Sequence, residues 1–105
     1  MDTLLIIEDE LLFGNELKRH FERQGWHVML VRTLRDAEQL LLRSRIGPLV
    51  VLSDMSLPDG NGLDLLAKVR GTGDTSEWVF LTGYGEAGDA ERARRRSRIS
   101  GRTLG

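Results

Sequence analysis

The chain has 105 residues with 16 acidic and 15 basic side chains and no cysteine. This length predicts one domain with a modest core, and the lack of cysteine excludes a disulfide framework or a thiolate metal site. Apolar stretches such as residues 49–52 are far shorter than the ~20 residues a membrane helix needs, and no secretory signal pattern opens the sequence, so we expect a cytoplasmic protein with no membrane partner.

Short apolar segments and amphipathic segments alternate along the chain. The apolar segments predict buried strands at residues 4–7, 27–31, 49–53 and 78–81. Helices are predicted at residues 11–24, after Thr33 in a segment that carries Leu34 to Leu41, at 63–70 and at about 89–98. Thr33, with Asp36 three positions later, resembles a capping arrangement for the second helix. Alternation at this spacing predicts an α/β fold, with a parallel sheet covered by helices on both faces.

Polar residues follow three of the predicted strands at their carboxyl ends, where open parallel sheets collect their chemistry. These residues are Glu8, Asp9 and Glu10 after the first strand, Asp54 after the third, and Thr82 and Gly83 after the fourth. A dinucleotide site would need a glycine-rich turn after the first strand. Acidic side chains there would repel a phosphate, so the pattern argues against a nucleotide-binding protein.

Carboxylates that converge favour a divalent cation, because like charges ~4 Å apart repel by ~4 kcal/mol at an effective dielectric constant of ~20. The ligands on offer are oxygens, and neither His20 nor His27 lies at the carboxyl end of a predicted strand. Magnesium fits such a set best. Asp54 then becomes a nucleophile toward a phosphoryl group. The turn at residues 58–62 leaves a main-chain carbonyl near Ser56 to face the ion.

Three segments, "LLIIEDE", "LSDMSLPDGNGLDLL" and "VFLTGYG", resemble in order and spacing the receiver domain of two-component response regulators. The resemblance covers roughly residues 3–92. It implies a flavodoxin-like open parallel sheet with strand order 2-1-3-4, in which the fifth strand of the family is missing or replaced. The "DGNGLD" and "TGYG" details are most similar to receivers attached to transcription activators of the enhancer-binding or redox-responding kinds.

The same resemblance implies a role for individual residues. Asp54 is the phosphoacceptor, and Thr82 is the switch hydroxyl. The acidic pair Glu8 and Asp9 holds Mg²⁺, with Asp54 and the main-chain carbonyl of Ser56 as further ligands. The implied partner is a sensor histidine kinase, and nucleic acid is reached only through a transcriptional output domain. Such a domain catalyses its own phosphorylation and dephosphorylation and no other reaction.

The chain departs from the family pattern toward its C-terminal end. The family carries a Lys-Pro pair and a switch aromatic residue with its fifth strand, whereas no lysine follows Lys68 here, and Tyr84 lies in the loop just past Thr82. We expect an incomplete receiver domain at residues 1–92 and a divergent basic tail at residues 93–105. A truncated chain, an altered reading frame and a naturally reduced receiver remain open explanations.

Charge changes in the same region, since residues 1–85 carry 9 Lys/Arg against 13 Asp/Glu and residues 86–105 carry 6 against 3. The short arginine run at residues 94–96 is more typical of a solvated helix face or a frayed end than of a nucleic-acid site. The exposed edge of the fourth strand predicts self-association through this strand. An exchanged element, or residues 97–105 as a makeshift strand, could cover the same edge instead.

Other functions stay open from the sequence. A pseudo-receiver would keep the fold as a protein-interaction module and escape control by phosphorylation. A phosphohydrolase of the haloacid dehalogenase type would need a second aspartate two positions after Asp54, where Ser56 stands. The acidic residues 8–10 could also be a solvated loop that stabilises the positive end of the following helix dipole.

Overall fold

The computed structural model describes residues 2–81, 98–99 and 102–103. A four-stranded parallel sheet forms its centre, in the order β2-β1-β3-β6. The strands are β1 (Thr3–Ile7), β2 (His27–Val31), β3 (Val50–Asp54) and β6 (Glu77–Leu81). Because β6 is the fourth strand of this sheet along the chain, the predicted order 2-1-3-4 is confirmed.

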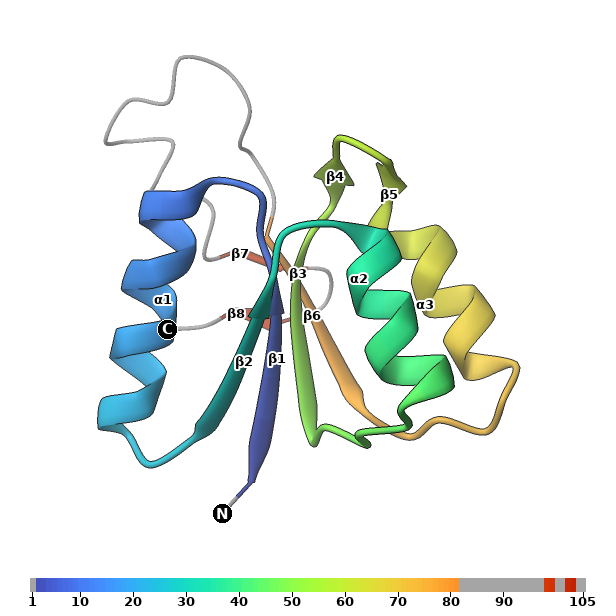
Figure 1. The fold of residues 1–105 in the computed structure, drawn as a ribbon, viewed down its shortest axis with the longest axis horizontal. Helices are drawn as coiled ribbons and strands as arrows, with labels where there is room; N and C mark the ends of the chain where they lie inside the picture. The colour runs from blue at the N-terminus through green and yellow to red at the C-terminus, as the bar shows by residue number, and fades with distance from the viewer. Residues whose placement is uncertain (1, 82–97, 100–101, 104–105) are drawn as a thin grey trace.

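Helices cover both faces of the sheet (Figure 1). One face carries α1 (Leu11–Arg23), and the other carries α2 (Leu34–Glu38) and α3 (Gly62–Arg70). The second predicted helix continues past α2 as a π-helical turn, η1 (Gln39–Arg43), which the sequence pattern did not indicate.

The strands are apolar on both faces, so each face of the sheet has its own hydrophobic core. Alternate strand residues point to opposite faces. Leu4, Ile6 and Leu52 therefore pack with Phe13 and Leu17 of α1. On the other face the core includes Leu5, Ile7, Val51, Trp78 and Phe80 from the strands and Leu34, Ala37, Leu41, Leu65 and Val69 from α2, η1 and α3. Two covered faces explain why the strands read as continuous apolar runs rather than alternating ones.

Two short hairpins accompany the sheet. Directly after β3, β4 (Ser56–Leu57) pairs antiparallel with β5 (Gly60–Asn61), where the sequence predicted a turn at residues 58–62. Near the end of the chain, β7 (Arg98–Ile99) pairs antiparallel with β8 (Arg102–Thr103).

The edge of the sheet next to β6 bears on the predicted self-association. Within the described residues β6 pairs with β3, while β7 comes close to β6 but pairs with β8. The predicted makeshift strand from residues 97–105 therefore does not join the sheet ladder in the described part of the chain. Most of the predicted helix at residues 89–98 lies outside the described residues, and the domain boundary at residue 92 stays a prediction.

Among the described residues, no helix has the length and apolar character that crossing a membrane requires.

Candidate functional site

Three acidic side chains meet at the carboxyl ends of β1 and β3. Ile7 is the last residue of β1 and pairs in register with Ser53, so the next residues along the two strands, Glu8 and Asp54, lie side by side. One carboxylate oxygen from each of Glu8, Asp9 and Asp54 lies within 4.8 Å of the other two. The structure thus brings together three of the residues that the sequence predicted for the site.

Burial makes negative charge on the side chains of this cluster energetically unfavourable. Glu8 is 0% exposed and Asp54 is 2% exposed, whereas Asp9 is half-buried. Two ionised carboxylates 4.8 Å apart repel by about 3 kcal/mol at an effective dielectric constant of about 20. A divalent cation with a preference for oxygen ligands removes this repulsion, so the donor set fits Mg²⁺.

Backbone contacts hold the loop between β1 and α1. The Glu8 N–H donates to the Val31 carbonyl oxygen at 3.0 Å, which extends the pairing of β1 with β2 into the acidic segment. The Glu10 N–H donates to Glu8 Oε2 at 3.0 Å. Arg32, the residue directly after β2, donates from Nη2 to the Asp9 carbonyl oxygen at 3.3 Å. These bonds fix the direction in which the loop presents its carboxylates.

A close backbone approach shapes the segment after Asp54. The Gly62 N–H donates to the Met55 carbonyl oxygen at 2.8 Å. A Cβ atom at Gly62 would lie 2.8 Å from the Asp54 carbonyl oxygen and 2.8 Å from the Phe80 ring. Only glycine lets the start of α3 come this near to the phosphoacceptor candidate.

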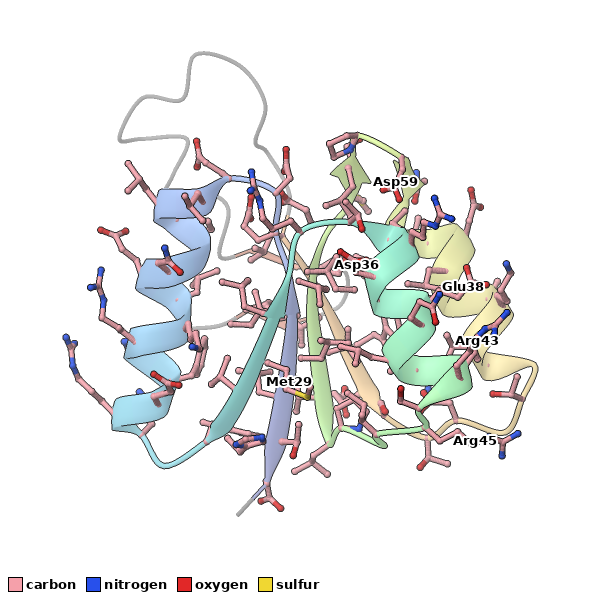
Figure 2. The ribbon with its side chains drawn as sticks, in the orientation of Figure 1. Met29, Asp36, Glu38, Arg43, Arg45 and Asp59 are labelled. Carbon is pink, nitrogen blue, oxygen red and sulfur yellow. The ribbon has the colours of Figure 1, made fainter. Side chains whose placement is uncertain are left out.

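The hairpin between β4 and β5 is tied to the start of α2 by Asp59 (Figure 2). Its Oδ1 and Oδ2 atoms accept the backbone N–H groups of Leu34 and Arg35, each at 3.0 Å. The bond from Leu34 has the largest effect on the pKa of Asp59, and together with the bond from Arg35 it lowers this pKa below its ordinary value, although burial acts in the opposite direction. The predicted cap of the same helix is confirmed, because Thr33 Oγ1 accepts the Asp36 N–H at 3.0 Å.

Sequence reasoning missed Asp59 as a tie between two elements. The sequence predicted a turn at residues 58–62 and no tie from it to another helix. Asn61 in the same turn caps α3, because its Oδ1 accepts the Leu63 N–H at 2.7 Å. The Pro-Asp-Gly sequence predicts a turn, but it does not indicate that the Asp59 side chain binds the start of α2.

The remaining predicted site residues stand as follows. Ser56 begins β4, two residues past Asp54, and the role of its carbonyl remains a prediction. Thr82 and Gly83 lie outside the described residues. His20 and His27 are exposed, on α1 and at the amino end of β2, away from the acidic cluster as predicted.

Comparison with known proteins assigns the family. The profile of the response regulator receiver domain matches residues 4–98. The chain belongs to the response regulator receiver domain family. Among curated proteins it is similar to the acid tolerance regulatory protein ActR of Rhizobium meliloti, at 33% identity over 91 residues that cover 87% of this chain and 46% of ActR.

Solved receiver structures agree in fold. The non-phosphorylated HemR receiver domain from Leptospira biflexa is 32% identical with a TM-score of 0.71, covering 90% of this chain and 73% of that one. The MaeR response regulator bound to beryllium trifluoride is 29% identical with a TM-score of 0.71, covering 90% and 78%. These neighbours share the flavodoxin-like open sheet predicted from the sequence.

The chain spans about half the length of the curated relatives it matches, as the 46% share of ActR shows. Receiver domains are regulatory modules of two-component systems, which work with sensor kinases and output domains. Relatives of this chain include a transcriptional regulatory protein, TrcR of Mycobacterium tuberculosis, and the aerobic respiration control protein ArcA of Escherichia coli.

Proposed function

We propose that this receiver domain accepts a phosphoryl group on Asp54 from a phosphohistidine of a sensor histidine kinase, in a magnesium-dependent reaction. The observation that carries the proposal is the convergence of Glu8, Asp9 and Asp54 at one edge of the sheet, with two of the three carboxylates buried. Buried carboxylates that converge at the carboxyl end of a parallel sheet are the expected setting for such chemistry.

The transfer assigns a distinct task to each group. An Asp54 carboxylate oxygen attacks the phosphorus atom, so a P–O bond forms while the P–N bond to the kinase histidine breaks, and the released imidazole takes up a proton from water. Glu8 and Asp9, with the Ser56 carbonyl, would hold Mg²⁺, which supplies positive charge against the phosphoryl oxygens. Thr82 would donate its hydroxyl to the bound phosphoryl group and so report the modified state.

A similar protein supports this proposal. MaeR is described as bound to beryllium trifluoride, an anion whose shape and charge imitate a phosphoryl group on a carboxylate. By likeness to TrcR, which is named as a transcriptional regulatory protein, we propose that the signal passes to a transcriptional output. Contact with nucleic acid would then belong to the output domain.

Labelling with acetyl phosphate and Mg²⁺ tests the proposal. Intact-protein mass spectrometry should find one added phosphoryl group, stable in acid and labile in base, and peptide mapping should place it on Asp54. Asp54→Ala should take no label, while Asp64→Asn, an exposed aspartate on α3, should be labelled as the wild type is. A label on another residue contradicts the assignment, and no label at all identifies a pseudo-receiver.

We further propose self-association through the outer edge of β6. This strand ends the four-stranded sheet among the described residues, and edge strands attract pairing. Light scattering over a dilution series should show a mass that rises with concentration, alike with and without acetyl phosphate. A monomer throughout the series contradicts this proposal and leaves phosphorylation of Asp54 untouched.

A further inference from the structure

Arg32 places a positive charge beside the acidic loop. It directly follows β2, whose last residue, Val31, accepts the Glu8 N–H at 3.0 Å. The Arg32 side chain then returns to the same loop, where Nη2 donates to the Asp9 carbonyl oxygen at 3.3 Å. The neighbouring residues Val31 and Arg32 thus bind the neighbouring residues Glu8 and Asp9. The guanidinium is therefore anchored at the carboxyl edge of the sheet, next to Glu8 and Asp9.

The type of contact determines what this charge can do. The observed bond goes to a main-chain oxygen, so it does not depend on occupying a carboxylate oxygen that a metal ion would use. A guanidinium keeps its charge at any physiological pH and has more N–H donors than this one bond uses. Arg32 is also exposed, so solvent and a solute can reach it.

An incoming phosphoryl donor needs such a group. It is an anion, and it must approach a cluster of three carboxylates within 4.8 Å of one another. Arginine forks match the geometry of phosphate oxygens. We propose that Arg32 receives the anionic phosphoryl donor at the mouth of this site, an inference that rests on the proposed function of Asp54.

The donor-concentration dependence of labelling distinguishes this role from a structural one. Arg32→Gln should raise the half-saturating concentration of acetyl phosphate about two- to fivefold, the range of one exposed charge pair, with little change in the saturated rate. Arg32→Lys should recover most of the loss, and added salt should shrink the difference. Arg19→Gln removes an arginine of α1 that is also exposed, and it should leave the half-saturating concentration unchanged.

Magnesium binding supplies a readout independent of turnover. Calorimetric titration of Mg²⁺ alone should show no weaker binding in Arg32→Gln, because the substitution removes a positive charge near the ligands. Titration of beryllium fluoride in saturating Mg²⁺ should show affinity reduced by about the same two- to fivefold. Arg32 would be purely structural if Mg²⁺ binding weakened in both the Gln and the Lys variant while the donor dependence stayed unchanged.

The outcomes separate the two proposals. Wild-type labelling on Asp54 with no difference between Arg32→Gln and Arg19→Gln overturns the role of Arg32 and leaves the phosphoacceptor intact. A wild type that takes no label overturns the proposed function, and the inference about Arg32 falls with it.

Discussion

Neutralising Asp54 should stabilise the metal-free protein, although the substitution alters a buried residue. Its carboxylate lies within 4.8 Å of those of Glu8 and Asp9, and it is 2% exposed. Each pair of charges at that distance repels by about 3 kcal/mol at an effective dielectric constant of about 20, less for the half-buried Asp9 because water screens it. Asp54→Asn keeps the shape of the side chain and removes its charge.

The expected gain in the free energy of unfolding is about 2 kcal/mol, since the amide also loses part of what the carboxylate gains from its local contacts. For a domain of this size, that corresponds to a rise of about 10 °C in Tm. Calorimetry and urea denaturation in the presence of a chelator measure both quantities. Asp64→Asn, which lies on the exposed side of α3, is the matched control and should change the stability little.

Magnesium completes the test. At about ten times its dissociation constant, Mg²⁺ should add about 1.4 kcal/mol to the wild type through binding to the folded state. Asp54→Asn should gain much less from Mg²⁺, because one ligand and two of the three pairwise repulsions are already gone. A metal-free Asp54→Asn protein no more stable than the wild type, together with an equal response of both to Mg²⁺, would refute the electrostatic reasoning.

Two further substitutions test the segments around the site. Asp59→Ala should lower the free energy of unfolding by about 1 kcal/mol near pH 7, because it removes the two hydrogen bonds that Asp59 accepts from the start of α2. Because the folded state lowers the pKa of Asp59, this contribution is present above the unfolded value of 3.8 and is lost as pH falls through the lower folded value. Urea denaturation at several pH values should thus show that the stability difference between the wild type and Asp59→Ala disappears in acid. Glu16→Ala on α1 is the control and should not show this pH dependence. Gly62→Ala should destabilise the protein by about 1–3 kcal/mol and slow labelling, because its Cβ would lie 2.8 Å from the Asp54 carbonyl oxygen. Gly71→Ala, with 3.4 Å to its nearest neighbour, should be tolerated; equal thermal stability of the two alanine variants would contradict the argument.

The strands could be predicted because the evidence for them is local and repeated, and their order was predicted from the resemblance to receiver domains. The apolar run at residues 27–31 coincides with β2, and the run predicted at 49–53 became β3 at Val50–Asp54, a shift of one residue that makes Asp54 the last residue of the strand. Alternating strands and helices then permit few arrangements, since parallel crossovers are right-handed. The same logic predicted that Glu8 and Asp54 would meet, and the register of Ile7 with Ser53 brings them together.

The sequence by itself determined the α/β class and the acidic edge of the sheet, because periodicity and turn residues act within a few positions of the chain, and its resemblance to receiver domains supplied the strand order. Only the tertiary structure decided the contacts that join distant turns. Asp59 binds the start of α2 across 25 residues, and Arg32 reaches the Asp9 carbonyl across 23. Neither pairing follows from local pattern, because a turn aspartate and an exposed arginine have many equivalent partners until the packed sheet sets the loops side by side.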